Sequence, residues 1–285
     1  MGDQVTTTSA PPGWYPDPWR QTPWRWWDGV AWTPFTDEWF SPTGKGAGAA
    51  GSPGAPLRAG GIAILGFLVG LAASTVIGVV LLLAGYGTTD PAFLLGSTLG
   101  LWFGLGGSCL VAVRAKGSGS LRDLGLVPPR LVDLGLGVGF AVAGIIAVSI
   151  AAAVLQAIDK QLLPGGRSDL SEPIQHGGAL GIFVIYLIAV VGAPFFEELY
   201  FRGLVQGTLS ARWGVGVAIV VQALLFGLVH LDPNNGWGNI GTFVIITIVG
   251  LGLGSIRQWS GRLPPGMATH AGYNAIIVTI AILAR

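Results

Sequence analysis

The sequence predicts an all-α polytopic membrane protein with about seven transmembrane helices, preceded by a small β-hairpin-type module. The first observation is composition: 51% of the 285 residues are hydrophobic and 10% are charged, whereas soluble domains carry about 25% charged residues. The second is the presence of 47 glycines, because small residues let transmembrane helices approach closely. The formal net charge is only +1, so we expect no nucleic-acid partner.

Residues 11–40 form the predicted N-terminal module, because they hold 7 of the 11 tryptophans. Within them, Asp28-Gly29 is typical of a two-residue hairpin turn between short strands. Because so short a segment cannot bury a conventional core, stacked tryptophans must supply one. Two roles are open for the tryptophans. They serve structure alone, or some of them line a groove for a protein partner, such as a proline-rich peptide. We expect a binding role.

This module resembles a small domain of unknown function found at the N-termini of bacterial membrane proteins. The resemblance rests on three short patterns, which are Gly13–Pro18, Trp26–Gly29 and Trp32-Thr33. It brings no activity with it.

Residues 41–58 are rich in Gly, Ala, Pro and Ser, which predicts a flexible linker. Residues 59–285 form the predicted transmembrane domain, because they contain repeated apolar runs of the length that crosses a bilayer. The expected spans are Gly60–Gly85, Pro91–Val113, Leu134–Ile158, Gly178–Phe196, Trp213–Leu231, Asn239–Ile256 and Gly266–Ala284.

The distribution of positive charge predicts the orientation of these spans. If the N-terminus is cytoplasmic, 12 of the 15 Lys and Arg residues fall on the cytoplasmic side, as the positive-inside rule requires. We therefore expect a multi-pass protein of the cell membrane with its C-terminus outside.

Two adjacent carboxylates follow the fourth apolar run, at Glu197 and Glu198, and Arg202 comes four residues later. A charge in hydrocarbon costs about 2.5–3.5 kcal/mol on insertion scales, so such groups are usually functional. Glu198 and Arg202 share a helix face and are expected to neutralise each other in a supporting role. Glu197 lies about 100° away around the helix axis and has no cationic partner in this pattern. We therefore expect it to be the reactive carboxylate.

Two more segments place polar groups in apolar helices, each with a spacing of four residues: Phe226 with His230, and His270 with Asn274. A desolvated Glu197 suits water activation, and the histidines and the asparagine can position the water or stabilise an oxyanion. Alternatively, Glu197, His230 and His270 could hold a zinc ion that carries this water. The spacing is not the His-Glu-x-x-His zinc motif. No Ser or Cys adjoins a histidine, which favours water over a covalent nucleophile.

These motifs together resemble the CAAX-protease and bacteriocin-processing (Abi) family of intramembrane proteases, over a protease core of about residues 120–285. The matching motifs are Glu197-Glu-x-x-x-Arg202, Phe226-x-x-x-His230 and His270-x-x-x-Asn274. The resemblance implies a helical endopeptidase in which Glu197 activates water beside His230, His270 and Asn274. Glu198, Arg202 and Phe226 then have supporting roles.

The resemblance leaves the cofactor and the substrate open. It is compatible with a metal-independent glutamate mechanism, which we expect, and with a zinc-dependent one. The implied substrate is a peptide or a membrane-protein segment near the bilayer surface, with a lipidated C-terminus as one option.

Two other functions compete with proteolysis. A catalytically inactive scaffold or bacteriocin-immunity protein of the same fold predicts that Glu197→Gln leaves the phenotype intact. A proton-coupled transporter would use Glu197 and the histidines as a relay, but it predicts an internal repeat that the sequence does not show.

One geometric difficulty accompanies the proposed site. Straight helices that rise about 1.5 Å per residue place Glu197, His230 and His270 at different depths. Three explanations are open. The fourth helix extends beyond the membrane, the 257–266 connection dips inward, or the outer segment 232–238 is re-entrant; irregular backbone is allowed where it lines a watery cavity.

Overall fold

The computed structural model describes residues 10, 13–20, 24–27, 31–36, 59–163, 177–232 and 234–283. The chain divides into two units, one up to Ala50 and one from Gly51. The predicted linker, residues 41–58, lies outside the described residues, as does the predicted Asp28-Gly29 turn.

The N-terminal unit contains a three-stranded antiparallel sheet in the order β1-β2-β3. Its strands are β1 (Gly13–Pro16), β2 (Trp24–Trp27) and β3 (Trp32–Thr36). Strands β2 and β3 pair across the predicted hairpin, with Trp27 opposite Trp32. Strand β1 adds a third strand that the hairpin prediction did not include.

Aromatic contacts hold this small sheet together. The ring centroids of Trp27 and Trp32 lie 5.3 Å apart, and that of Tyr15 lies 6.2 Å from Trp32. Arg25 and Asp17 form a buried ion pair of 3.0 Å beside them. An aromatic cluster therefore takes the place of a larger core, as expected for so short a segment; a binding role for it stays a prediction.

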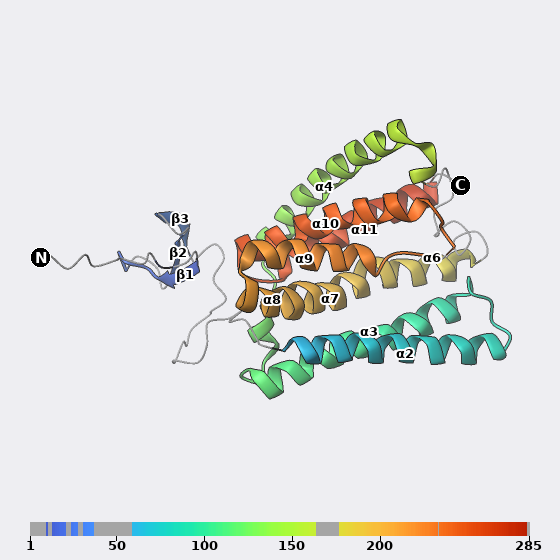
Figure 1. Ribbon diagram of the computed structural model, residues 1–285, viewed down its shortest axis with the longest axis horizontal. Helices are drawn as coiled ribbons and strands as arrows, with labels where there is room; N and C mark the ends of the chain where they lie inside the picture. Colours follow the sequence, from blue (N-terminus) through green and yellow to red (C-terminus); the bar gives the residue numbers. More distant parts are fainter. Residues whose placement is uncertain are drawn as a thin grey trace, which may run out of the picture. The chain divides into compact units, whose positions relative to one another are not determined.

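The second unit is helical, and six of its described helical segments are long and apolar enough to cross a membrane (Figure 1). They are α2 (Gly60–Leu83), α3 (Pro91–Lys116), α4 (Leu131–Ile158), the run Gly178–Trp213, α10 (Gly238–Ser260) and α11 (Pro264–Leu283). The predicted span Trp213–Leu231 is instead α9 (Val215–Leu228), which has 14 residues and is shorter than the about 20 needed for a span. The all-α polytopic membrane fold is confirmed, with six candidate spans and one shorter apolar helix.

Close backbone contact fixes the α2–α3 hairpin, whose two helices run side by side in Figure 1. A Cβ atom at Gly104 would lie 2.3 Å from the carbonyl oxygen of Gly66, so only glycine fits there. The Tyr200 hydroxyl donates a 2.8 Å hydrogen bond to the carbonyl of Ala63, which connects α2 to the long run Gly178–Trp213. The short helices η1 (Leu121–Leu124) and η2 (Lys160–Leu162) lie in the connections on either side of α4.

The run Gly178–Trp213 alternates between α-helix and the wider π-helix. Its parts are α6 (Gly178–Tyr186), η3 (Leu187–Gly192, π), α7 (Ala193–Glu197), η4 (Glu198–Val205, π) and α8 (Gln206–Trp213). Pro194 has no N–H to donate, which fits the break in regular α pairing next to η3. Because π turns are rare and often accompany functional sites, the two around α7 draw attention to the Glu197-Glu198 pair.

The connection between α10 and α11 is buried. Arg262 is 0% exposed and Leu263 is 1% exposed, and the Leu263 N–H donates to the carbonyl of Gly125 over 2.9 Å. Arg262 also pairs with Asp133 at the start of α4. Helix α11 therefore begins inside the protein, at the connection where an inward dip was one of the three expected explanations; the depth of the site in the membrane stays a prediction.

Candidate active site

Glu197 is the last residue of α7, immediately before the π turn η4. Its Oε2 atom is buried and has no hydrogen-bond partner in the part of the chain that the structure describes. The same atom lies 4.0 Å from Nε2 of His230 and 4.0 Å from Nε2 of His270. The structure thus brings together the carboxylate and the two histidines that were identified on three separate segments.

His230 follows the end of α9, and its orientation is set by its own helix. Its Nδ1 lies 2.7 Å from the carbonyl oxygen of Phe226. Because a carbonyl oxygen can only accept, Nδ1 carries the hydrogen. The Nε2 atom faces Glu197, and in the neutral tautomer it would present its lone pair there.

His270 lies on α11 and is held in the same way by a carboxylate. Its Nδ1 lies 3.1 Å from Oε1 of Glu198, and the same oxygen accepts a 2.8 Å hydrogen bond from Nη1 of Arg202. Glu198 and Arg202 form the predicted ion pair, and both are 0% exposed. The contact with His270 was missed, because it joins residues 72 positions apart on different helices.

Phe226 supports the site from α9. The guanidinium carbon of Arg202 lies 4.2 Å from the centroid of its ring, and the rings of His230 and His270 contact it edge-on at 4.6 and 6.0 Å. Nε and Nη2 of Arg202 have no hydrogen-bond partner among the described residues. The aromatic face therefore supplies a cation–π contact where hydrogen bonds are missing.

Asn274 lies one turn beyond His270 on α11. Its Nδ2 donates a 2.7 Å hydrogen bond to the carbonyl of Ala189, which belongs to the π turn η3. The amide group has two hydrogens, so a second one is available. Asn274, Glu197, His230 and His270 line one cavity of about 260 Å³, which we call the Glu197 cavity.

The match to known proteins falls on this part of the chain. Residues 179–276 match the family model described as type II CAAX prenyl endopeptidase Rce1-like. The chain therefore carries an Rce1-like domain. Comparison with curated proteins gave no significant match, and neither did comparison with solved structures.

The match supports a membrane endopeptidase of the CAAX protease type. The matched range runs from α6 into α11 and contains every residue of the predicted site. It is shorter than the predicted core of about residues 120–285, and the tryptophan-rich sheet lies outside it.

The Glu197 cavity brings several hydrogen-bond acceptors close to one another. The Glu197 carboxylate and the two Nε2 lone pairs cannot bond to one another without a donor between them. A water molecule has two hydrogens and occupies about 30 Å³, so the Glu197 cavity has room for one next to a substrate group. The arrangement can therefore hold a water molecule against a carboxylate base.

The positions of the same donor atoms bear on the zinc alternative. Among the described residues, no three His, Cys, Asp or Glu side chains are grouped so that they could hold a metal ion. Zinc ligands lie about 2.0–2.2 Å from the metal, and tetrahedral ligands therefore lie about 3.4 Å from one another. Both Nε2 atoms are 4.0 Å from Oε2 of Glu197, which is somewhat wider than this spacing.

Proposed function

We propose that the protein is an intramembrane endopeptidase in which Glu197 activates the attacking water directly. The observation that carries this proposal is the buried, unpartnered Oε2 of Glu197, at 4.0 Å from both Nε2 atoms. Glu197 supplies the carboxylate that faces both imidazoles. Its position in a cavity large enough for water and a peptide group suits it to general base catalysis.

In the first step, the water oxygen bonds to the carbonyl carbon of the peptide while Glu197 takes a proton from the water. Nε2 of His230 or His270 accepts the second water hydrogen and so orients the nucleophile. The carbonyl oxygen becomes an oxyanion, and the free amide hydrogen of Asn274 stabilises it. In the second step the C–N bond breaks, and the leaving amine takes the proton from Glu197.

Glu198 acts through His270 in this scheme. By accepting a hydrogen bond from Nδ1, it fixes the ring orientation and the tautomer, as a carboxylate does for the histidine of a catalytic triad. Arg202 neutralises Glu198, so the buried carboxylate can remain charged. Glu198 and Arg202 are therefore positioning residues, with Phe226 packed against both the arginine and the histidines.

The substrate in this proposal is a peptide or a membrane-protein segment that reaches the Glu197 cavity near the bilayer surface. The name of the matched family refers to prenylated proteins, so a lipidated C-terminus is one form of it. We place the N-terminus in the cytoplasm and the C-terminus outside. In this arrangement, residues 11–40 act as a partner-binding module and residues 41–58 as its linker to the transmembrane domain at 59–285.

The decisive experiment measures cleavage of a fluorogenic peptide library by the purified protein in lipid nanodiscs. Glu197→Gln keeps the side-chain shape but removes the base, so kcat/KM should fall by about 10²–10⁴-fold with an unchanged melting temperature. Asp159→Asn is the matched control, because Asp159 accepts a hydrogen bond from the Gln161 N–H at an exposed position, and the Asn oxygen can do the same. Cleavage by Glu197→Gln at the wild-type rate would contradict the proposal.

A chelator titration of the same preparation separates the two routes of water activation. With Glu197 as the direct base, kcat/KM should not change on chelation. Loss of cleavage on chelation, with recovery on adding zinc, would support the metal-dependent route instead.

A further inference from the structure

The segment η4–α8 and helix α9 form a helical hairpin with its turn at Gly214, and the two arms run side by side in Figure 1. Side chains on both arms recur at intervals of four residues. They are Glu198, Arg202 and Gln206 on the first arm, and Gln222, Phe226 and His230 on the second. Because this spacing places side chains on one face of a helix, each arm carries a continuous row that starts at the candidate active site.

Two contacts already described join these rows. Oε2 of Glu197, next to the first row, lies 4.0 Å from Nε2 of His230. One turn closer to the hairpin turn, the guanidinium carbon of Arg202 lies 4.2 Å from the ring centroid of Phe226. The next turn of each arm brings a third pair together, which was not part of the predicted site.

This third pair consists of Gln206 and Gln222, which meet at α10. Nε2 of Gln206 donates a 3.0 Å hydrogen bond to the carbonyl of Gly254, and Nε2 of Gln222 donates one of 2.9 Å to the carbonyl of Gly250. A Cβ atom at Gly254 would lie 2.5 Å from Nε2 of Gln222 and 3.1 Å from Oε1 of Gln206. The two amides therefore lie beside each other, and glycine leaves room for them.

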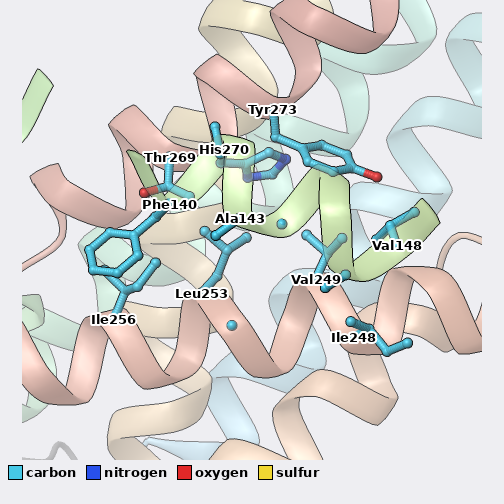
Figure 2. Close-up of a pocket in the computed structure, with 14 residues that line it drawn as sticks. Phe140, Ala143, Val148, Ile248, Val249, Leu253, Ile256, Thr269, His270 and Tyr273 are labelled. Atoms are coloured by element: carbon cyan, nitrogen blue, oxygen red, sulfur yellow. The ribbon is translucent and has the colours of Figure 1, made fainter. Parts of the chain in front are cut away.

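The helix that these amides hold also forms a wall of the candidate active site. Figure 2 shows Val249 and Leu253 of α10 opposite His270 and Tyr273 of α11, and Val249 also lines the Glu197 cavity. Gly250 directly follows Val249, so the hydrogen bond to its carbonyl fixes this part of the wall. The third pair is thus connected to the site through α10 as well as through the two rows.

The polar atoms of the third pair are only partly used. Gln206 is 3% exposed and Gln222 is 0% exposed, yet Oε1 of each amide has no hydrogen-bond partner among the described residues. The buried Nε and Nη2 of Arg202, one turn from Gln206, also lack one. Because each Nε2 already donates to a carbonyl, exchanging oxygen and nitrogen in either amide would place two acceptors together. Buried polar atoms are costly to leave unsatisfied, so a bound group must both accept from Arg202 and donate to the amides.

We propose that water is bound between Arg202, Gln206 and Gln222, and that the two glutamines thereby act as positioning residues of the active site. Water accepts from the arginine and donates to both Oε1 atoms, and buried water typically makes about three such bonds. An anion would face two amide oxygens and the Glu198 carboxylate, and a cation would face the arginine. The hydrated amides fix Arg202, which fixes Glu198 and, through it, His270. Only the effect on catalysis rests on the proposed function.

The first test is a crystal structure of the full chain at a resolution that shows ordered water. We expect a water molecule within about 3.2 Å of both Oε1 atoms and of a free nitrogen of Arg202. In Gln206→Met this water should be lost or displaced. A direct bond between Arg202 and a glutamine, or no water between these groups, would overturn the proposal.

The second test measures peptide cleavage in lipid nanodiscs. Gln206→Met and Gln222→Met keep the length of the side chain and remove the amide. Each should lower kcat about tenfold with KM within about twofold, less than the about 10²-fold that a 1 Å displacement can cost. Gln156→Met is the matched control, because Gln156 is exposed on α4, and its kcat should equal that of the wild type. An unchanged kcat in both glutamine variants would overturn the positioning role.

The third test separates positioning through the ion pair from a general structural role. Gln206→Met is combined with Glu198→Gln and Arg202→Met, which remove the pair through which it acts. Residues of one network are not additive, so the added substitution should change the remaining kcat by less than about twofold. A tenfold loss in both backgrounds would overturn the positioning role. If the wild type cleaved no peptide, the proposed function would fail, whereas the crystal structure would still decide whether water is bound.

Discussion

The described part of the helical unit contains two buried carboxylate–arginine pairs, and they differ in how completely their carboxylate oxygens are used. Glu198 and Arg202 are four residues apart on one helix, whereas Asp133 and Arg262 are 129 positions apart and join α4 to the α10–α11 turn. The Asp133 carboxylate is satisfied on both oxygens, by Arg262 and by the backbone N–H of Arg130. The carboxylate of this pair is therefore fully used, whereas Nε and Nη1 of Arg262 have no hydrogen-bond partner among the described residues.

The Glu198 carboxylate is left incomplete at one oxygen. Its Oε1 is shared between Arg202 and His270, and its Oε2 has no partner among the described residues. A buried pair of this kind contributes little net stability, because desolvation offsets the attraction. The difference between the pairs indicates that one holds the fold together, whereas the other holds a histidine in position.

Burial affects the arginine of the structural pair as expected for a charge away from water. Desolvation lowers the pKa of the Arg262 guanidinium, and the neighbouring Asp133 carboxylate opposes this shift. Because the carboxylate favours the charged form, the pair is expected to stay ionised at neutral pH and to keep the α10–α11 turn attached to α4.

The largest expected effect comes from neutralising each pair by a matched double substitution. Glu198→Gln with Arg202→Met removes the carboxylate that orients His270, so kcat/KM should fall by about 10²–10⁴-fold. Asp133→Asn with Arg262→Met should keep cleavage within about threefold, because neutral replacement of a buried pair is often tolerated. Peptide cleavage and thermal unfolding are measured for both proteins. If both double variants lost cleavage to the same extent per folded molecule, the two pairs would not differ in function.

The next effect is on stability and should be similar for the two pairs. Arg202→Met or Arg262→Met alone leaves a buried carboxylate uncompensated, which costs about 3–5 kcal/mol of unfolding free energy. Denaturant unfolding in mixed micelles measures this loss, with the corresponding double variants as controls. If Arg202→Met were as stable as the wild type, Glu198 would have to be neutral or better solvated than the structure indicates.

The smallest effect is expected from a single methyl group beside Glu198. A Cβ atom at Gly266 would lie 3.1 Å from Oε2 of Glu198, whereas one at Gly272 on the same helix would lie 3.3 Å from Cβ of Ala141. Gly266→Ala should displace the carboxylate slightly and lower kcat by about threefold to tenfold, less than the about 10²-fold that a 1 Å displacement can cost. Gly272→Ala should leave kcat within about twofold of the wild type. The reverse pattern would mean that the position of Glu198 does not control the rate.

Local sequence determined much of this protein. Long apolar runs predicted the membrane helices, because about 20 such residues span hydrocarbon. A spacing of four residues predicted the Glu198–Arg202 pair, because helix geometry alone brings such residues together. The Asp28-Gly29 signal predicted two paired strands in the N-terminal unit, and β2 and β3 are paired there.

Only the tertiary structure decided how these pieces meet. The Glu198–His270 contact, the buried start of α11 and the Glu197 cavity each depend on how separate helices pack. Side-chain periodicity within one helix carries no information about the partner helix. The π turns on both sides of α7 likewise replace the regular helix that hydropathy predicts. Sequence spacing therefore identified the chemical groups of the site, whereas packing between helices set their depth, their tautomers and the shape of the space that they share.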